Sequence, residues 1–213
     1  MRTLQESEST ASPRPVRVGP LAPAHRTRVR DILEATGVFR PDEVDVALEL
    51  FDETFGESRM TNGDGNTAAD PSDPSAIRHP PSAIASPSTG SDYLFLGAFT
   101  PEDELVGYAC YGPTPETDRT FDLYWIAVDP RAQGSGGGTR LLSEVEGKLQ
   151  REHARMLVIE TSSRPEYAAT RGFYLARGYH EAARVGNYYA PADDRVIYTK
   201  RFHPTNSPAG RGA

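Results

Sequence analysis

Apolar residues along the chain follow two spacings: short runs typical of strands, and one-sided stripes typical of helices. The clearest helix is predicted to begin at Pro41, because proline suits the first turn and Asp42 and Glu43 complement the positive helix end. Its apolar stripe consists of Val44, Ala47, Leu48, Phe51 and Phe55. Further helices are expected at about 24–35, 138–152 and 166–177. Strands are expected at about 16–18, 93–99, 105–111, 121–128, 156–161, 180–185 and 195–201.

The order of these elements indicates the class of fold. Strands and helices follow one another as β-α-α-β-β-β-α-β-α-β-β. The three strands between residues 93 and 128 are joined by short polar loops, which is typical of a meander. This order predicts an α/β domain with a mixed sheet.

Three segments, 1–15, 57–91 and 202–213, lack the large apolar residues needed for a core. We expect the first and last to be disordered tails. The middle segment is predicted to be a flexible surface insertion, because so few apolar residues cannot offset the entropy lost on ordering it. We interpret this segment as an insertion that the fold tolerates, and the alternative interpretation is a functional lid. The remaining chain within 16–201 has the size of one domain.

Composition and charge exclude several classes of protein. With 37% apolar residues the chain can form an ordinary core. No apolar run approaches the roughly 18 residues of a membrane span, and the first 15 residues lack the apolar stretch of a signal peptide. A net charge of −7 argues against nucleic-acid binding and weakly favours a cationic substrate. We therefore expect neither a membrane nor a nucleic acid as partner.

The single cysteine, Cys110, cannot form an intramolecular disulfide, which indicates a reducing, cytoplasmic setting. We interpret it as a small buried strand residue rather than a nucleophile. The five histidines are scattered, with no two at ligand spacing, so no metal site is expected.

A glycine-rich stretch between a predicted strand and a predicted helix carries the chemical information. It reads Ile-Ala-Val-Asp-Pro-Arg-Ala-Gln-Gly-Ser-Gly-Gly-Gly-Thr over residues 126–139. Pro130 ends the strand because it cannot donate to the ladder, and the residues after it place successive backbone N–H groups at the start of the helix. Glycine lets a ligand approach such amides closely, and with the helix dipole they form a site for a phosphate or diphosphate. The amides belong to Gln133, Gly134, Ser135, Gly136, Gly137, Gly138 and Thr139.

Three known glycine motifs do not fit this stretch. A Walker A loop needs Gly-Lys-Ser/Thr, but Gly138 is followed by Thr139 and Arg140. The dinucleotide fingerprint G-x-G-x-x-G fails because Thr139 or Leu141 stands at its last position. A nucleophile elbow fails because Gln133 stands where glycine is needed.

The pattern that fits is Gln-x-x-Gly-x-Gly at Gln133, Gly136 and Gly138, preceded by Val-Asp-Pro. It resembles the acyl-CoA-binding core of the GNAT superfamily of N-acyltransferases, and Phe173-Tyr-Leu-Ala-Arg-Gly-Tyr179 resembles that family's FYxxxGF segment. The resemblance covers the whole predicted domain and implies a mixed, mostly antiparallel sheet flanked by helices on both faces. One departure is Gly137, where the family usually has an aliphatic residue. The alternative is a glycine-rich loop that merely turns the chain, which the second motif makes less favourable.

The resemblance implies acetyl-CoA as co-substrate and a split in the sheet. The strand at 121–128 would diverge from the strand at 156–161 and expose the main chain of Ile126, Ala127 and Val128 for pairing with the pantetheine arm. The N–H of Ile126 would face the thioester carbonyl, and the amides of the glycine-rich stretch would hold the diphosphate.

Two proton transfers need candidate residues, because the attacking amine must be neutral and the leaving thiolate must be protonated. Tyr174 stands at the family's general-acid position; its alternative role is that of a core aromatic beside Phe173. We select Glu160 as general base, since it stands at the carboxyl end of its strand. Its alternative role, an ion pair with an arginine, is equally favoured. Asp122 or a water relay is a further candidate base. Residues predicted to line the acceptor site are Asp122, Asn187, Tyr188 and Tyr189, the last three in the loop before the final strand.

Together these inferences predict a cytoplasmic N-acetyltransferase. It would move an acetyl group from acetyl-CoA to a primary amine by direct transfer in a ternary complex, with a small-molecule acceptor favoured. The alternatives are a non-catalytic acyl-CoA-binding regulatory module and a protein N-acetyltransferase. A homodimer is left open, and no metal is expected.

Overall fold

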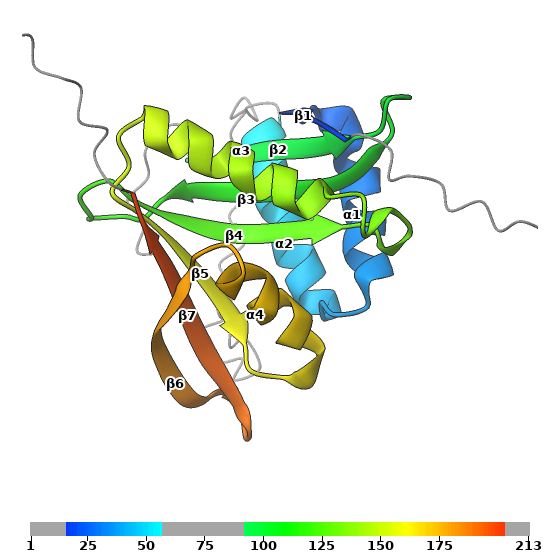
Figure 1. Ribbon diagram of the computed structural model, residues 1–213. Helices are drawn as coiled ribbons and strands as arrows, with labels where there is room; N and C mark the ends of the chain where they lie inside the picture. Colours follow the sequence, from blue (N-terminus) through cyan, green and yellow to red (C-terminus); the bar gives the residue numbers. More distant parts are fainter. Residues whose placement is uncertain (1–15, 57–91, 203–213) are drawn as a thin grey trace, which may run out of the picture.

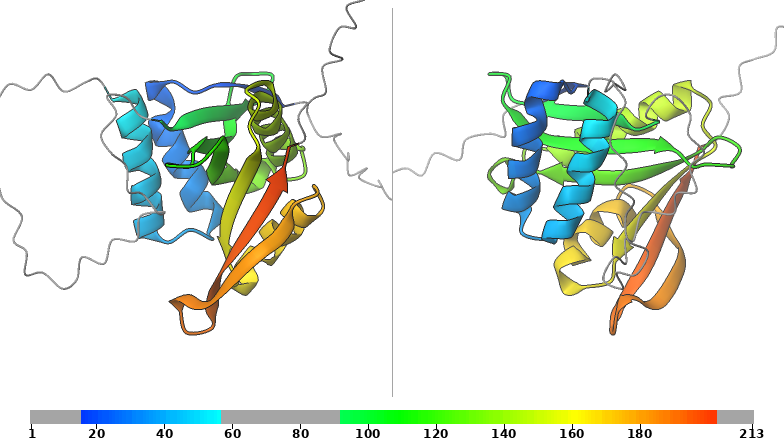
Figure 2. Two further views of the ribbon diagram at one scale, coloured as in Figure 1. Left: turned by 90° about the vertical axis from the view of Figure 1, so that its left-hand side faces the viewer. Right: turned by 180° about the vertical axis from the view of Figure 1, so that it is seen from behind.

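The computed structural model describes residues 16–56 and 92–202, which form one mixed sheet with helices on both faces (Figures 1 and 2). The strands are β1 (Arg17–Pro20), β2 (Leu94–Phe99), β3 (Leu105–Pro113), β4 (Thr120–Val128), β5 (Met156–Ser162), β6 (His180–Ala190) and β7 (Asp193–Arg201). The helices are α1 (Arg26–Thr36), α2 (Pro41–Phe55), α3 (Gly137–Arg151) and α4 (Ala168–Leu175), with 3-10 turns at Pro23–His25, Pro130–Ala132 and Pro165–Tyr167. Each predicted helix and strand is present, so the predicted fold class is confirmed.

Most predicted boundaries lie within two residues of the observed ones, but one strand end and one predicted tail differ from the structure. Strand β6 continues to Ala190, so residues 187–189 lie in a strand and not in a loop, because the β6–β7 hairpin pairs as far as Ala190 and Asp193. Phe202, which we expected in a disordered tail, is 7% exposed, and its N–H donates to the carbonyl of Arg155 at 3.0 Å. The predictions for residues 1–15, 57–91 and 203–213 lie outside the described residues.

The strand order is β1-β2-β3-β4-β5-β7-β6. All neighbouring strands are antiparallel except β4 and β5, which are parallel. The sheet is therefore mostly antiparallel, as predicted. No helix among the described residues is long and apolar enough to cross a membrane.

Each face of the sheet has its own apolar core. Helices α1 and α2 cover one face, and α3 and α4 cover the other (Figure 2, left). The stripe of α3, at Leu141, Leu142, Val145 and Leu149, is at most 1% exposed. Truncating one such leucine to alanine typically lowers the free energy of unfolding by about 2–5 kcal/mol. Burial of this kind on both faces stabilises the centre of the sheet. Cys110 in β3 is also buried, at 1% exposed, as predicted.

The sheet opens between β4 and β5. These strands pair only over Thr120–Leu123 and Met156–Ile159, and beyond that point they diverge (Figure 1). The opening begins at a β-bulge, because Leu123 pairs with Tyr111 and Trp125 with Cys110, which leaves Tyr124 as the extra residue. A bulge bends its strand and increases the local twist. Consequently, no strand of the described residues lies along the β5-facing edge of the second half of β4, from Tyr124 to Val128.

Asp129 fixes the end of β4 where the glycine-rich loop begins. Its side chain is 1% exposed and accepts hydrogen bonds from the guanidinium groups of Arg28 on α1, at 2.6 Å, and Arg131, at 2.8 Å. Its own N–H donates to the carbonyl of Val106 on β3 at 2.8 Å. These hydrogen bonds, foremost those from Arg131, hold the pKa of Asp129 well below its usual range. One carboxylate therefore connects α1, β3 and the loop.

We predict that Asp129→Asn lowers the free energy of unfolding at pH 7 by about 2–3 kcal/mol, because an enclosed charge-assisted network is lost. The depressed pKa stabilises the fold above the unfolded-state value of about 4, and this contribution disappears as the pH falls through the folded-state pKa. The difference between the two proteins should therefore shrink on acidification, as measured by urea unfolding at several pH values. Arg131→Gln, at a side chain 76% exposed, removes one partner and keeps the carboxylate and its bond to Arg28, so it should cost clearly less than Asp129→Asn. Equal losses in the two variants would contradict this role for the carboxylate.

Candidate functional site

The amino end of α3 presents backbone N–H groups that the helix does not use. Gly136 is the N-cap, and its carbonyl accepts the first helical hydrogen bond from the N–H of Arg140 at 2.9 Å. The three residues between them, Gly137, Gly138 and Thr139, have no intrahelical acceptor for their N–H groups. These three amides and the positive end of the helix dipole form a site suited to an anion.

At Gly134 and Gly136 glycine is required by the backbone conformation and not by a neighbouring protein atom. Gly134 and Gly136 both have φ of +82°, in the left-handed region, and a Cβ on either would meet nothing within 4 Å. At Gly138 a Cβ would lie 3.6 Å from the side chains of Val128 and Phe173, an ordinary contact. These contacts are all within the protein, so the expectation that glycine lets a ligand approach the amides closely stays a prediction.

Not every predicted amide points toward a ligand. The N–H of Gln133 donates to the carbonyl of Pro130, and that of Ser135 donates to the carbonyl of Ala132, both at 3.3 Å. The Ser135 hydroxyl also donates to Ala132, at 2.6 Å. These two residues shape the turn, and the amides available at the helix start are those of residues 137–139.

A cation that the sequence analysis missed lies beside these amides. The guanidinium of Arg177 stacks on the Phe173 ring, 3.6 Å from its centroid, and donates to the hydroxyl of Thr139 and the carbonyl of Phe173. Its Nε is enclosed and has no partner within the described part of the chain. Arg177 stands four residues after Phe173, and this spacing could have revealed the pair, because residues four apart share one helix face.

The unpaired edge of β4 offers main-chain groups to the opening. The N–H of Asp129 donates to Val106, so Asp129 faces β3. Main-chain groups of successive residues in an antiparallel pair face opposite sides, so Ala127 also faces β3. The N–H and carbonyl groups of Ile126 and Val128 then face the opening, on the side where β5 has diverged. Of the three residues predicted to pair with a ligand, Ile126 and Val128 present their main-chain polar groups to the opening, and Ala127 does not.

The two predicted proton-transfer residues lie on opposite sides of the sheet. Tyr174, on α4, is 3% exposed, and its ring packs against Tyr179 and Tyr198, with centroids 5.7 and 6.1 Å away. Burial raises its pKa well above the ordinary value. Its ring is part of the core on the α3 side, whereas Phe173 is turned toward Gly138.

Glu160, on β5, faces a small cavity on the α2 side and forms an ion pair with Arg195 of β7. Arg195 also donates to the hydroxyl of Tyr188 at 3.1 Å. Asp122 lies in the paired part of β4, opposite Val158, and accepts a hydrogen bond from Thr114 at 2.7 Å. Burial raises the pKa of Asp122, but its side chain does not line the cavity.

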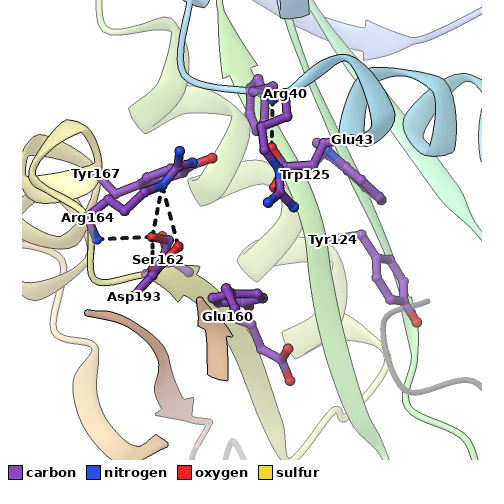
Figure 3. Close-up of a pocket in the computed structure, with 12 residues that line it drawn as sticks. Arg40, Glu43, Tyr124, Trp125, Glu160, Ser162, Arg164, Tyr167 and Asp193 are labelled. Carbon is purple, nitrogen blue, oxygen red and sulfur yellow. Dashed lines mark hydrogen bonds and ion pairs between the residues drawn. The ribbon is translucent and has the colours of Figure 1, made fainter. Parts of the chain in front are cut away.

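The cavity has a volume of about 140 Å³ and occupies the place where β4 and β5 have separated (Figure 3). Its aromatic walls are Phe39, Tyr124, Trp125, Tyr167 and Tyr189. Its charged lining residues are Arg40, Glu43, Glu160, Arg164 and Asp193, and Thr161 and Ser162 complete it. The Thr161 hydroxyl is enclosed and has no partner among the described residues. Only Glu160 and Tyr189 of this lining were predicted from the sequence.

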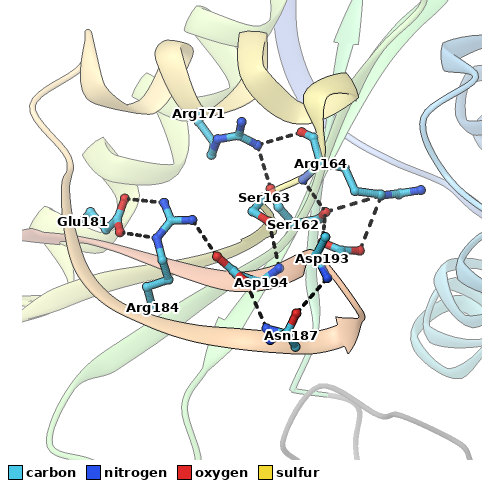
Figure 4. Close-up of polar contacts among 10 residues, drawn as sticks. Ser162, Ser163, Arg164, Arg171, Glu181, Arg184, Asn187, Asp193 and Asp194 are labelled. Atoms are coloured by element: carbon cyan, nitrogen blue, oxygen red, sulfur yellow. Dashed lines mark hydrogen bonds and ion pairs between the residues drawn. The ribbon is translucent and has the colours of Figure 1, made fainter.

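The three residues predicted for the loop before the last strand have different surroundings. Tyr189 lines the cavity, and burial raises its pKa to about 12. Asn187 supports the hairpin instead: its N–H donates to the carboxylate of Asp194 at 2.9 Å and its side-chain oxygen accepts from Ala192 at 2.7 Å (Figure 4). Tyr188 contacts Arg195, whose guanidinium lies 4.9 Å from the ring centroid.

Polar contacts fasten the end of β5 to the β6–β7 hairpin (Figure 4). The Ser162 hydroxyl donates to Asp193, and the N–H of Asp194 donates to the Ser163 hydroxyl at 2.7 Å. Arg171 of α4 donates to the carbonyls of Ser162 and Arg164. The cavity wall is thereby held in place on this side. Within residues 16–56 and 92–202, no group of three or more His, Cys, Asp or Glu side chains is close enough to hold a metal ion.

Comparisons with known proteins agree with this geometry. Residues 67–179 match the sequence profile of the acetyltransferase (GNAT) family. A crystal structure assigned to that family, from Desulfovibrio desulfuricans, is 36% identical, with 87% of this chain and 98% of that chain covered and a TM-score of 0.69. No curated protein matches the chain.

Two more distant structures show the same fold. The ribosomal-protein-S18-alanine N-acetyltransferase from Escherichia coli is 18% identical, covering 93% of this chain and 98% of its own, with a TM-score of 0.60. The PaiA N-acetyltransferase from Thermoplasma acidophilum, in complex with coenzyme A, is 13% identical, covering 88% and 99%, with a TM-score of 0.57.

The left-handed conformation at the start of α3 leads to a prediction for Gly136→Ala. The new methyl group meets nothing, so the substitution tests backbone conformation alone and should lower the free energy of unfolding by about 1–2 kcal/mol. Gly172→Ala on α4 is a matched control, because a Cβ there also meets nothing but the backbone is helical; it should raise stability by up to about 1 kcal/mol. The measurement is the thermal unfolding of both variants. A change in stability of the same sign in both would contradict the prediction.

Proposed function

Because the chain belongs to the GNAT family of acetyltransferases, we propose that it transfers the acetyl group of acetyl-CoA to the primary amine of a small molecule within a ternary complex. The observation that carries this proposal is the opening between β4 and β5. Unused helix amides, a cation and a free strand edge lie at it, and a polar cavity opens on the α2 side. A direct transfer needs the two substrates on either side of one gap, held in alignment.

The residues present fit acetyl-CoA as the donor. The amides of residues 137–139 and the guanidinium of Arg177 can bind a diphosphate, because each terminal nitrogen of Arg177 keeps one N–H beyond its bond to Phe173 or Thr139. The main chain of Ile126 and Val128 can pair with an extended amide-containing arm, as an added strand would. When bound, acetyl-CoA supplies an acetyl group activated as a thioester.

The roles of the protein groups follow from their positions. The N–H of Ile126 faces the opening and can donate a hydrogen bond to a carbonyl oxygen placed there as negative charge develops. Glu160 lies in the acceptor cavity, where it can take a proton from the attacking amine, directly or through water. Its ion pair with Arg195 positions the carboxylate.

Tyr174 is proposed to return a proton to the departing sulfur. Its raised pKa keeps the hydroxyl protonated throughout the neutral range, as a general acid requires. The ring packing that buries the residue also limits its motion, so the hydroxyl would be held in one position for the transfer. In the transfer step itself, which starts from the neutral amine, the nitrogen loses one proton and the sulfur gains one.

We predict that Tyr174→Phe lowers kcat by about 100-fold, since the ring still fills the core but the proton donor is gone. The measurement is thiol release from acetyl-CoA across a panel of amines, with donor binding followed by calorimetry and expected to be unchanged. Tyr198→Phe is the matched control, because Tyr198 is 2% exposed in the same aromatic cluster and should leave the rate unchanged. An unchanged rate in Tyr174→Phe would remove this residue from the mechanism. If acetyl-CoA binds but no amine or peptide releases thiol, the chain is a non-catalytic acyl-CoA-binding module.

For Arg177→Gln we predict about tenfold weaker binding of acetyl-CoA, because a charge-assisted contact to the diphosphate is lost. Binding of a pantetheine thioester without phosphate groups should not change. Arg151→Gln, at the other end of α3 and 66% exposed, serves as control and should bind the donor normally. Equal weakening for both donors would indicate a packing role for Arg177 beside Phe173 instead.

A further inference from the structure

The acceptor cavity is not an acidic site, although the chain carries a net charge of −7. Each of its three carboxylates has an arginine partner. Glu43 lies 3.7 Å from the guanidinium of Arg40, and Asp193 lies 3.6 Å from that of Arg164. Glu160 is paired with Arg195. The cavity therefore offers no surplus negative charge to select a simple cationic amine.

Two of these arginines retain donor capacity toward the cavity. Arg164 contacts Ser162 and Asp193 through Nε alone, at 3.4 and 3.6 Å, so its terminal nitrogens are not used in either contact. The neighbouring Tyr167 can accept one N–H, which leaves the others for a ligand. The guanidinium is positioned by stacking on the Tyr167 ring, 5.2 Å from its centroid.

The guanidinium of Arg40 is held even more loosely. It lies 3.5 Å from Asp42 and 3.7 Å from Glu43, both longer than a good hydrogen bond. The Glu43 carboxylate is instead engaged by the backbone N–H of Arg40, at 2.7 Å, as part of the helix cap. A planar guanidinium with free N–H groups is the side chain best suited to bind a carboxylate.

The two arginines and Glu160 lie in different parts of the cavity. Arg40 and Arg164 extend from the side of α2 and the Pro165–Tyr167 turn, and Glu160 lies apart from them on β5 (Figure 3). An acceptor whose amine faces Glu160 thus directs its opposite end toward the two arginines. The cavity lining also includes the aromatic side chains of Trp125 and Tyr189, which suit a short apolar body.

The volume limits the acceptor to a small molecule. The cavity volume of about 140 Å³ is several times the roughly 10–15 Å³ that one water needs by the same measure, so the cavity can hold a small organic molecule. A compact acceptor, with its amine and its acidic end a few atoms apart, matches this size.

We propose that the acceptor is a small free α-amino acid, whose carboxylate is bound by Arg164 and Arg40 while its amine faces Glu160. This rests on the proposed function. In the reaction the amine nitrogen forms a bond to the acetyl carbon and the carbon–sulfur bond breaks, giving an N-acetylamino acid and the thiol. The ammonium releases one proton to solvent to become the nucleophile. On acylation the nitrogen loses a second proton, which Glu160 takes up, and the sulfur gains one from Tyr174; the two side chains then exchange protons with water, so the reaction releases one proton in all.

The test compares free amino acids with analogues that lack the carboxylate. Thiol release from acetyl-CoA is measured for glycine, alanine and serine, for their carboxamides, and for short peptides that begin with them. We expect kcat/KM for the free acids to exceed that for the carboxamides by at least tenfold. Comparable rates for acids and carboxamides, or a preference for peptides, would overturn the proposal.

Two variants tie the preference to the named residues. Arg164→Gln and Arg40→Gln should each raise KM at least tenfold for the free acids, with little change for the carboxamides. Arg119→Gln, remote from the cavity and 56% exposed, is the control and should change neither. Equal losses for acids and carboxamides in both cavity variants would show that the arginines only support the fold, and would overturn the proposal.

A binding measurement separates this inference from the proposed activity. Calorimetry with coenzyme A present, where no transfer can occur, should detect alanine but not alaninamide, and Arg164→Gln should abolish the heat. If no amine releases thiol yet alanine binds in this way, the amino-acid site stands and the transferase function fails. If thiol is released with other amines but alanine neither binds nor reacts, the amino-acid site fails alone.

Discussion

The separation of β4 from β5 is the constraint on which the site depends. Two strands that start as a hydrogen-bonded parallel pair at Thr120 and Met156 have lost their pairing by residue 124. The backbone N–H and carbonyl groups of Ile126 and Val128 have no strand partner on this side within the described sheet. A ligand that pairs with this edge would form the hydrogen bonds that a neighbouring strand would otherwise make. The bulge at Tyr124 is the local cause, since the extra residue turns the strand away from its neighbour.

The opening also separates two kinds of chemistry. On the side of α3 and α4, helix amides and the guanidinium of Arg177 concentrate positive potential near an apolar core. On the side of α1 and α2, a small cavity has paired charges and aromatic walls. The groups proposed to bind a phosphate-bearing donor are thereby kept apart from the groups proposed to bind an amine. This arrangement lets both substrates meet at the gap without sharing a binding surface.

Polar contacts hold the strand ends on either side of the gap. Asp129 ties the end of β4 to α1 and β3, and the contacts of Ser162 and Ser163 tie the end of β5 to the hairpin. The two apolar cores then hold the helices against the sheet. An opening in a sheet would otherwise be the place where strands slide or close, and these enclosed polar contacts oppose that movement.

The sequence by itself determined the elements, their order and the glycine-rich start of α3. Those features depend on residues within a few positions of one another: the stripe of α3, the left-handed glycines at 134 and 136, and the Phe-Tyr pair on α4. The tertiary structure alone decided where the cavity lies, because Arg40, Trp125, Arg164 and Tyr189 are far apart along the chain and no local spacing relates them. It also assigned Asn187 to the hairpin and placed Arg177 beside the helix amides. The physical reason is that a strand or helix forms from local spacing, whereas a site between diverging strands depends on which distant segments the packing of the two cores brings together.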